Sequence, residues 1–514
     1  MFSKVKSCAV HGVDGRMIDV EADVNDGLPV FTMVGYLSSS VREASERVRT
    51  ALKNSGFHLP PKRITINLSP ADMRKDGSGY DLAIATAVLL SLGVTAELPM
   101  EQTLVLGELS LDGSIKAIPG VLPMVICARE EGMTSCIVPK ENVKEAALVQ
   151  GISVIGVSSL QETMEYIQGI KEVENTNVEQ PAVDTSEYLY DIDFSDVVGQ
   201  ESIKRGMEIA AAGFHNVLLT GAAGAGKSML AKRLPTILPQ MSFEESLEVT
   251  KIYSVGGMLP PEGGLIHRRP FRAPHHTISE YALIGGGRVP TPGEVSFAHY
   301  GVLFLDELPE FSKPVLEVLR QPLEDRRIRI SRVQASYDFP ADFMFVAAMN
   351  PCPCGNYPDY RRCSCTEQQI RRYQSKVSGP LLDRIDIRME VKGVKQEALF
   401  SKQKTESSKT IRARVEQARQ MQKERFAGTG LLFNSQLDGK NLEEYITLSE
   451  EGKRLVLQLF EEQELSVRGV HRVLKLARTI ADLAGSEEIE HAHLQEAAFY
   501  RNQDVFAKEV LYGN

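Results

Sequence analysis

The chain has 514 residues, of which 43% are hydrophobic and 25% are charged, and its formal net charge at pH 7 is −10. These proportions are typical of a globular protein of roughly three domains, and no apolar run reaches the ~18 residues of a membrane-spanning helix. The acidic balance excludes a chain that is basic throughout, so any contact with nucleic acid must be local. Seven cysteines, together with an N-terminus that lacks a secretory-signal pattern, predict a cytoplasmic protein without a disulfide framework.

Four segments differ in composition along the chain. Residues 1–168 alternate short β-rich runs with helical ones, which predicts an α/β domain. Residues 169–190 are acidic and nearly free of large apolar side chains, so they predict a linker. From 191 to 393 apolar strands alternate with helices, the pattern of a parallel sheet covered on both faces, and 394–514 has a helical pattern. The predicted fold class is therefore α/β with a helical C-terminal domain.

A glycine-rich loop stands between a strand and a helix of the third segment. The apolar run 216–220 leads into GAAGAGKS at 221–228, and a helical run follows. This is the G-x-x-x-x-G-K-S pattern in the setting that phosphate binding needs, because backbone N–H groups and a helix N-terminus close on the phosphates. Lys227 is expected to reach the β- and γ-phosphates and the Ser228 hydroxyl to ligand Mg²⁺. The predicted nucleotide-binding loop comprises Gly221, Ala222, Ala223, Gly224, Ala225, Gly226, Lys227, Ser228 and Met229.

A second apolar strand ends in two acids. The run GVLFLDELPEF at 301–311 places Asp306 and Glu307 directly after the strand. A carboxylate at that end of a strand beside the phosphate loop can complete the Mg²⁺ shell, and the next one can polarise a water for in-line attack. A buried strand with a polar exit would explain the apolar run, but it would not explain two adjacent acids.

These motifs resemble those of an AAA+ ATPase, a P-loop NTPase, and the resemblance continues along the module. FSDVVGQ at 194–200 resembles the segment that lines the adenine pocket, and FVAAMNP at 345–351 resembles the sensor-1 strand. LLDRIDI at 381–387 resembles the arginine-finger segment, and LSVRGVHRVLKLAR at 465–478 resembles the lid helix that carries sensor 2. The residues to which the resemblance assigns roles are Val198 and Gly199 at the base, Asn350 at the water, Arg384 as the finger and Arg468 as sensor 2.

The resemblance implies ATP and Mg²⁺ as ligands and a homo-oligomer, usually a hexamer, because an arginine finger completes the site of a neighbouring subunit. Without the resemblance, an ion-pair role would be the default for Arg384 and Arg468. On the expected lid helix, Arg472 and Lys475 share a face with Arg468. The prediction for Arg472 and Lys475 is a solvated basic face.

Two further stretches indicate which branch of the AAA+ proteins the chain resembles. ALIGGGRVPTPGEVSFAHYG at 282–301 resembles a hairpin inserted in the second helix, and LEDRRIRISRVQASYDFP at 323–340 resembles the hairpin before sensor 1. Both indicate the magnesium-chelatase-like branch and most closely the YifB/ComM family. In the second stretch, Arg327, Arg329 and Arg332 allow two readings, phosphate contact inside a ring pore or an edge strand kept soluble by charge. The adjacent His275 and His276 are expected to be structural, since no third metal ligand stands nearby in the sequence.

Resemblance to this family implies a ring motor that acts on single-stranded or branched DNA, as a branch-migration helicase of natural transformation does. The alternative is a chelatase-like or chaperone-type motor that remodels a protein partner, and a third reading is a scaffold that binds ATP without turnover. Between 401 and 425 eight Lys or Arg stand against three Glu. That excess could follow a phosphate backbone, although a solvated helix face is the simpler account.

The N-terminal segment resembles the proteolytic domain of Lon. The resemblance covers SPADMRKDGSGYDLAIATAVLLSLG at 69–93 and the stretch 104–142. That domain uses a Ser–Lys dyad, in which the amine activates the hydroxyl. Here the nucleophile position falls on Gly79, with Ser78 one place early, and the lysine position falls on Leu122. The sequence therefore predicts a Lon-like scaffold that does not cut peptides.

Four of the seven cysteines stand in one short polar stretch. In NPCPCGNYPDYRRCSCTEQQ, at 350–369, two C-x-C pairs are separated by eight residues. Four thiolates can form a closed tetrahedral Zn²⁺ site that holds a loop without a core of its own. Free buried thiols and a redox or iron–sulfur site remain as alternatives. The candidate zinc ligands are Cys352, Cys354, Cys363 and Cys365.

Overall fold

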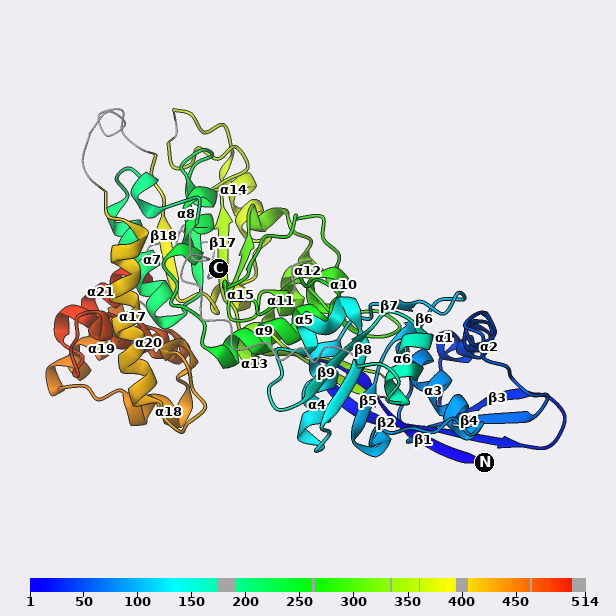
Figure 1. Ribbon diagram of the computed structural model, residues 1–514. Coiled ribbons are helices and arrows are strands. Elements are labelled where there is room, and N and C mark those ends of the chain that lie inside the picture. The colour runs from blue at the N-terminus through cyan, green and yellow to red at the C-terminus, as the bar shows by residue number, and fades with distance from the viewer. Residues whose placement is uncertain are drawn as a thin grey trace.

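The computed structural model describes residues 1–172, 190–260, 264–332, 335–359, 361–393, 405–462 and 465–501. Three parts adjoin one another in chain order: an N-terminal α/β domain, a central sheet with its helices, and a C-terminal group of helices (Figure 1). Most of the predicted linker, residues 173–189, and the predicted boundary near 394 lie outside the described residues.

The N-terminal domain is built on one mixed seven-stranded sheet. Its spatial order is β3 (Phe31–Val34), β4 (Arg63–Ser69), β2 (Asp14–Asn25), β1 (Phe2–His11), β5 (Thr103–Val105), β8 (Ser135–Pro139) and β9 (Ser153–Val157). Strands β1 and β2 form a long antiparallel pair, from Phe2 opposite Asp23 to His11 opposite Asp14. Burial alternates along β4, as it does on a strand with one face against a core.

Helices cover this sheet. They are α1 (Ser39–Arg42), α2 (Ala44–Asn54), α3 (Asp81–Ser91), α4 (Val121–Glu130), α5 (Val143–Ala146) and α6 (Leu160–Ile167), and a small β6–β7 pair (Glu108–Leu109 and Ile115–Lys116) precedes α4. Helix α3, with the sequence DLAIATAVLLS, is buried at every position except Leu90. A helix that is apolar on all sides must lie inside the domain, and α3 packs against β1, β2, α2 and α6.

The central part contains a five-stranded parallel sheet. The strand order is β11 (Phe271–Arg272), β14 (Val302–Leu305), β17 (Met344–Met349), β10 (Val217–Thr220) and β18 (Ile387–Glu390). Every residue of β10, β14 and β17 is buried, as expected for a parallel sheet covered on both faces. The prediction of a parallel α/β core is confirmed. The carboxyl ends of β10, β14 and β17 meet at one edge of the sheet.

The surrounding helices are α7 (Glu201–Gly213), α8 (Lys227–Arg233), α9 (Phe243–Val255), α10 (Glu280–Ile284), α11 (Glu294–Phe297), α12 (Lys313–Val318), α13 (Arg320–Asp325), α14 (Glu367–Gln374) and α15 (Gly379–Leu382). Two of the helix starts follow local sequence rules. Ser242 caps α9 and Thr366 caps α14, each in a capping box with the glutamate or glutamine three residues later.

Two hairpins project from the central part. Strands β12 (Gly285–Gly286) and β13 (Thr291–Pro292) pair between α10 and α11, and β15 (Arg327–Ser331) pairs with β16 (Ser336–Pro340). Along β15 the side chains of Arg327 and Arg329 are exposed and Ile328 is buried, the alternation of a strand with one face against a core. Arg329 forms an ion pair with Asp338 across the hairpin, at 2.8 Å. The hairpins touch where Arg332 Nη2 donates to the carbonyl oxygen of Gly287, at 3.1 Å.

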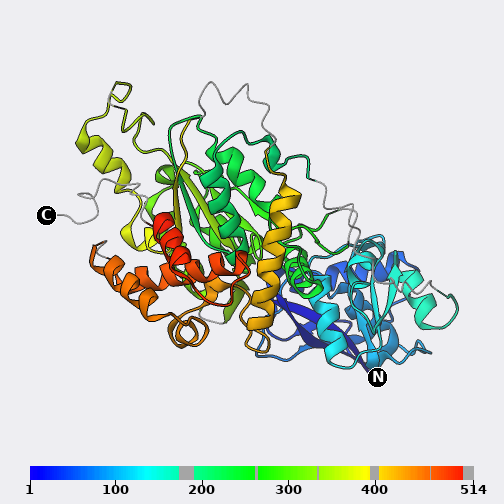
Figure 2. The same ribbon diagram turned by 90° about the vertical axis from the view of Figure 1, so that its left-hand side faces the viewer.

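The C-terminal part is helical over its described residues. It comprises α17 (Ser408–Arg425), α18 (Gly439–Tyr445), α19 (Glu450–Glu462), α20 (Val467–Leu483) and α21 (His491–Arg501). Helices α17 and α20 lie against α7 (Figure 2), and one hydrophobic core joins the central sheet to these helices. The rings of Phe214, at the end of α7, and Phe433 stack with centroids 4.3 Å apart.

Three basic side chains of α17 contact other parts of the protein. Arg414 pairs with Glu208 and Glu406, and Arg419 lies 4.0 Å over the ring of Phe433. Arg425 forms an ion pair with Asp482 at 2.5 Å. The simpler account of this stretch as a solvated helix face therefore does not hold for these three arginines, whereas Lys409 and Lys423 are exposed. Lys402 and Lys404 lie outside the described residues.

The N-terminal domain docks on the central part through the turn between β1 and β2. Val13 belongs to the hydrophobic core beside β14 and β17, and the His11 ring stacks on Tyr337 of β16 at 4.5 Å. A second contact joins α4 to α9, where the backbone N–H of Gly120 donates to the carbonyl oxygen of Ser254 at 3.0 Å. Besides the covalent connection, packing and a hydrogen bond therefore hold the N-terminal domain against the central part.

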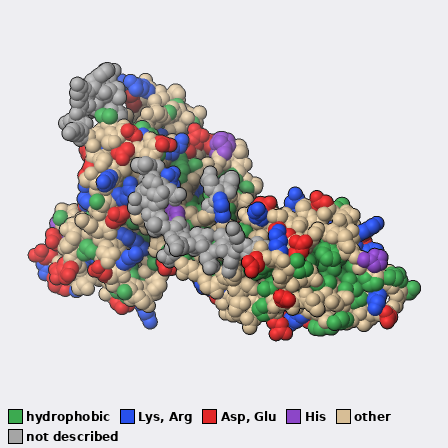
Figure 3. Space-filling model, in the orientation of Figure 1, with side chains coloured by type: hydrophobic (Ala, Val, Ile, Leu, Met, Phe, Trp, Pro, Cys, Tyr) green, Lys and Arg blue, Asp and Glu red, His purple; other side chains and the backbone are tan. Residues whose placement is uncertain are grey.

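The surface is mixed in charge. Acidic and basic side chains are interspersed in the view of Figure 3, and hydrophobic side chains gather over the N-terminal domain. Exposed large apolar residues of that domain include Phe2, Leu28, Val30 and Val34. A search of the described residues finds no helix with the length and apolar character needed to cross a bilayer.

Candidate active site

The predicted phosphate loop joins β10 to α8 and lines a cavity of about 320 Å³. Gly224 and Gly226 have φ of +76° and +96°, in the left-handed region that glycine enters without steric cost. The lining consists of residues 223–229 with Asp306, Glu307, Met349 and Asn350. Three predicted groups, the loop, the two acids and Asn350, are thus brought together at the carboxyl edge of the central sheet.

Lys227 is held beneath the loop. Its Nζ donates to the carbonyl oxygens of Gly221 and Ala222, at 2.7 and 2.9 Å, and to Oδ1 of Asn350 at 3.0 Å. Burial lowers the pKa of Lys227, against the opposing influence of the Asp306 and Glu307 charges. All three acceptors are neutral, so a phosphate oxygen would give the ammonium a stronger, charge-assisted partner.

Ser228 and Asp306 place two hard oxygen ligand atoms, a hydroxyl and a carboxylate, side by side. The Ser228 hydroxyl donates to Oδ2 of Asp306 at 2.5 Å, and Asp306 Oδ1 accepts from the backbone N–H of Glu307 at 3.0 Å. A hydroxyl beside a carboxylate, next to a phosphate loop, is the donor set that Mg²⁺ takes together with phosphate oxygens and water. The two residues therefore fit the predicted metal.

Glu307 adopts a left-handed backbone conformation, with φ of 53°. Its side chain is 58% exposed and reaches the edge of the cavity. Nδ1 of His276 lies 4.0 Å from a Glu307 carboxylate oxygen, and the rings of His275 and His276 are 4.1 Å apart. The sequence did not indicate this neighbour of Glu307, because it comes from the segment after β11.

The predicted adenine segment runs beside α8. Arg233 of α8 donates to the carbonyl oxygen of Asp193 at 2.7 Å and pairs with Asp196 at 2.9 Å. Val198 and Gly199 follow this anchored stretch and lie outside the lining of the phosphate cavity. The segment is thus adjacent to the phosphate loop without entering the cavity.

Arg384 and Arg468 lie together at the opposite edge of the sheet. Both line a second cavity, of about 270 Å³, with Arg326, Arg472 and Lys475. Asn216, just before β10, donates its side-chain amide to the carbonyl oxygen of Arg384 at 2.9 Å. Strands of four to six residues separate the two edges by roughly 13–20 Å, so neither arginine reaches the phosphate loop of its own chain. Arg384 pairs with Glu324 of α13.

A buried ion-pair network supports this second cavity. Asp386 accepts from the backbone N–H of Asn216 at 3.2 Å and pairs with Arg472 at 2.9 Å, and His215 Nδ1 lies 3.4 Å away. Burial would raise the pKa of Asp386, but the His215 hydrogen bond and the Arg472 charge outweigh burial and hold it well below its usual range.

The prediction of a solvated face for Arg472 and Lys475 is therefore wrong. Arg472 pairs with Asp386, its side chain only 18% exposed, and Lys475 Nζ donates to the carbonyl oxygen of Ser435 at 3.1 Å. The helical spacing that groups the two residues was right, but it does not show that this face of α20 packs against Asp386 of the central part and against Ser435.

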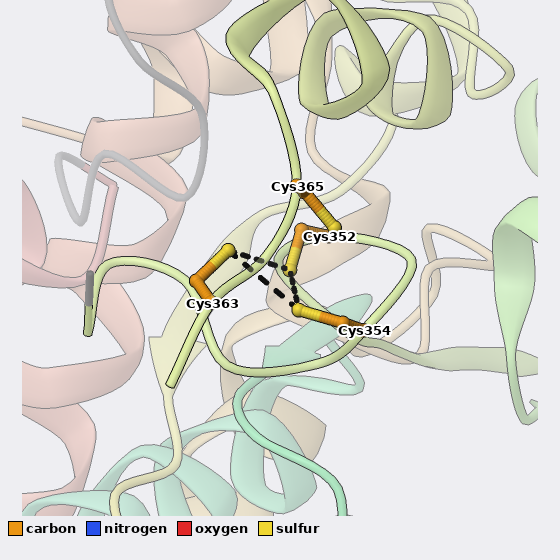
Figure 4. A group of neighbouring side chains, drawn as sticks. All are labelled: Cys352, Cys354, Cys363 and Cys365. Atoms are coloured by element: carbon orange, nitrogen blue, oxygen red, sulfur yellow. Dashed lines mark hydrogen bonds between the residues drawn. The ribbon is translucent and has the colours of Figure 1, made fainter. Parts of the chain in front are cut away.

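The four clustered cysteines converge in the loop between β17 and α14. Figure 4 shows their sulfur atoms turned toward a common point, and one ligand atom from each lies within 4.8 Å of the others. Cys352 is buried, and Sγ–Sγ separations are 3.4 Å to Cys354 and 3.8 Å to Cys363. Among the described residues this is the group of cysteine, histidine and acidic side chains suited to a metal ion.

Comparison with known proteins covers nearly the whole chain. Three family models match: magnesium chelatase subunit ChlI over residues 193–399, subunit ChlI of Mg-chelatase over 20–142, and the ChlI C-terminal model over 405–501. An uncharacterised protein of Mycobacterium tuberculosis is 43% identical over 480 residues, 93% of this chain and 94% of that one.

YifB of Escherichia coli is 41% identical over 504 residues, 98% of this chain and 97% of YifB. The competence protein ComM of Haemophilus influenzae is 41% identical over 503 residues, 97% of each chain. The chain belongs to the YifB/ComM family. It is thus an AAA+ protein of the magnesium-chelatase-like branch.

The Lon resemblance of this YifB/ComM-family chain is also confirmed. Lon protease 2 of Bacillus subtilis is 30% identical over 183 residues, 32% of each chain. At the dyad positions, a Cβ added to Gly79 would lie 3.1 Å from Cδ1 of Ile118, and Leu122 is fully buried. The backbone N–H of Leu122 donates to Glu145 at 2.8 Å. At the two positions predicted for the dyad the chain thus has Gly79, which lies beside Ile118, and the buried Leu122.

Proposed function

We propose that the protein is a ring-forming ATPase that uses ATP hydrolysis to move or remodel DNA. The observation that carries the proposal is the division of the catalytic groups between two edges of one sheet. The phosphate loop and acids lie at the carboxyl edge, and Arg384 and Arg468 lie at the other, out of reach of the loop. A complete site therefore requires two subunits, as a homo-hexamer provides.

In the proposed reaction, the loop N–H groups and Lys227 bind the triphosphate, and the Lys227 ammonium exchanges backbone carbonyls for phosphate oxygens. Ser228 and Asp306 hold Mg²⁺, which when bound neutralises charge on the β- and γ-phosphates. Glu307 accepts a proton from the attacking water, and Asn350 orients that water while it holds Lys227.

The neighbouring subunit contributes the charge stabilisation. Arg384, with Arg468 beside it, would face the γ-phosphate of the next subunit, where negative charge is spread over the transferring group. Arg384 is paired with Glu324 in the single chain, so formation of the interface would exchange a carboxylate for a phosphate. Val198 and Gly199 are proposed to border the base, next to α8.

DNA is the proposed substrate because the two hairpins present basic groups on an otherwise acidic chain. Arg327 is exposed on β15, and Arg332 bridges to the other hairpin at Gly287. Arg329 is already paired with Asp338, which supports the charge-solubilised edge for that residue. By kinship with ComM, whose name marks it as a competence protein, we propose branch migration during recombination in natural transformation, in the cytoplasm, on single-stranded or branched DNA.

The second candidate is remodelling of a protein partner, as in a chelatase-type motor. The match to the magnesium chelatase models supports it. Stimulation of ATP hydrolysis separates the two candidates. We expect forked or single-stranded DNA to raise the rate and unfolded protein to leave it unchanged, and the reverse result would favour the second candidate. Proteolysis is not proposed, because Gly79 and Leu122 replace the dyad.

The site assignment is tested by mixing two inactive variants. Lys227→Ala should abolish nucleotide binding, and Glu307→Gln should bind ATP but turn it over at least 100-fold more slowly. Arg384→Ala should bind ATP normally and also be inactive. In rings mixed from Glu307→Gln and Arg384→Ala subunits, some sites combine an intact Glu307 with an intact neighbouring Arg384, so ATPase activity should return. Mixtures that stay inactive while forming rings would refute the shared site.

A further inference from the structure

The four cysteine sulfurs have the spacing of a single tetrahedral ion. A Zn–S bond of about 2.3 Å sets the sulfurs of a tetrahedral site roughly 3.8 Å apart. The observed separations among Cys352, Cys354 and Cys363 are 3.4, 3.6 and 3.8 Å, and Cys365 lies within 4.8 Å of the other three. A disulfide would bring two sulfurs to about 2.05 Å. An iron–sulfur cluster places several atoms between its thiolates and would hold them further apart.

The loop that carries these cysteines packs on the phosphate loop. A Cβ added to Gly355 would lie 3.4 Å from the backbone nitrogen of Ala223 and 3.8 Å from Cγ of Asn350. A Cβ at this position would thus just fill the space between the two loops, and the φ of +79° at Gly355 is a backbone conformation that residues other than glycine rarely adopt. The Cys loop therefore lies directly beside Ala223 of the phosphate loop and beside Asn350.

Further bonds fix the loop to its surroundings on the far side. The Gln374 side chain of α14 donates to the carbonyl oxygen of Pro351 at 2.9 Å, and the backbone N–H of Tyr357 donates to Cys352 Sγ at 3.4 Å. Only Cys352 of the four cysteines is buried, so the loop has little apolar core of its own. Cross-linking at the sulfurs is the remaining means of holding its shape.

We propose that Cys352, Cys354, Cys363 and Cys365 bind one Zn²⁺ ion, and that this ion sets the affinity of the ATP site by fixing the loop that places Gly355 beside Ala223 of the phosphate loop. The site has four protein ligands and no open position, so its role is structural. The second half of the proposal rests on the proposed function of the phosphate loop. Because binding free energies are linked, nucleotide should in turn tighten the binding of zinc by the same factor.

Metal content and nucleotide affinity of the full chain test the two halves separately. We expect about one zinc per chain by mass spectrometry of the digested protein, and tetrahedral thiolate absorption bands after replacement by Co²⁺. Cys363→Ser should lose most of the metal. Cys127→Ser, a half-buried cysteine of the N-terminal domain, is the matched control and should keep it. Iron with inorganic sulfide, or no metal at all, would overturn the site.

Binding of a fluorescent ADP analogue tests the coupling without DNA or ring formation. Removal of zinc by a thiol reagent and chelator should weaken binding roughly tenfold, within the usual range of coupling between sites, and zinc re-addition should restore it. This reversible arm needs no variant and so does not depend on whether Cys363→Ser folds. Unchanged affinity in zinc-free protein would overturn the coupling. Should Lys227→Ala bind the analogue normally, the proposed ATP site would fail instead, with zinc content unaffected.

Discussion

Replacement of Arg472 by alanine should destabilise the protein in a way that depends on pH. Arg472 is the cationic partner of Asp386, which lies in the cleft between β18 and α20 with a side chain 10% exposed. Removing the guanidinium leaves the carboxylate with the His215 ring and the backbone N–H of Asn216. The buried charge then lacks its main compensation, which is the costly half of breaking a buried pair.

The cost of leaving the Asp386 carboxylate unpaired has an upper limit. An unpaired buried carboxylate can escape its penalty by taking up a proton, and at pH 7 that costs about 4 kcal/mol for a group of ordinary pKa 3.9. We therefore expect Arg472→Ala to lower the free energy of unfolding by about 3–4 kcal/mol at pH 7, and by up to about 2.7 kcal/mol less at pH 5, because protonation becomes cheaper by about 1.36 kcal/mol for each pH unit.

The direction of the pH dependence follows from the linkage between proton binding and folding. In the wild-type protein the pKa of Asp386 is depressed, so its stabilisation is present above the unfolded pKa and is lost as the pH falls below about 4. In the variant the pKa of Asp386 rises. The difference in the free energy of unfolding between wild type and variant therefore becomes smaller as the pH falls from 7 to 5. Urea unfolding of the nucleotide-free chain, followed by circular dichroism at both pH values, measures this difference.

Two controls separate charge from packing. Arg468→Ala removes a guanidinium one turn away on the same face of α20 and should cost under 1 kcal/mol. In the double variant Asp386→Asn with Arg472→Ala, no carboxylate is left unpaired, so most of the loss should be recovered. A penalty that is the same at pH 5 and pH 7, or a double variant as unstable as Arg472→Ala, would refute the reasoning.

Three other predictions concern different parts of the chain. Asn350→Ala removes the 3.0 Å partner of Lys227 and should slow steady-state ATP hydrolysis about 100-fold with little change in ADP affinity; a fall in affinity alone would count against Asn350 as a water-orienting group. Burial lowers the pKa of Lys475 to about 8, so stability should rise by up to roughly 3 kcal/mol between pH 8 and 10.5, and Lys475→Met should remove that rise in urea titrations. Gly79→Ser should show no peptidase activity on unfolded casein, and measurable cleavage would reverse the scaffold assignment.

The residues that line the phosphate cavity could be predicted because each motif is local in sequence. A glycine loop with Lys227 between strand and helix, and acids at the end of an apolar strand, define their own surroundings. Asn350 joined them because the carboxyl ends of parallel strands meet at one edge, which is a rule of topology. The parallel sheet itself followed from continuous apolar runs, all of which are buried.

Contacts between distant segments could not be read in the same way. Periodicity grouped Arg472 and Lys475 on one face of a helix, but the burial of that face depends on Asp386, 86 residues away from Arg472. The pairing of Arg384 with Glu324, and the contact of Gly355 with Ala223, likewise join segments with no shared pattern. In each case tertiary packing decides whether a charge or a glycine is at the surface.

The turn at Val13 fixes one end of the β1–β2 pair inside the central core, so any tilt of the N-terminal domain that the α4–α9 contact allows has its pivot there. Strands β1 and β2 run 10 and 12 residues away from that turn, a reach of roughly 33–40 Å, so a tilt of about 5° at the pivot sweeps the far end through roughly 3 Å. A shift too small to disturb packing next to Tyr337 is thereby magnified at the opposite tip of the sheet.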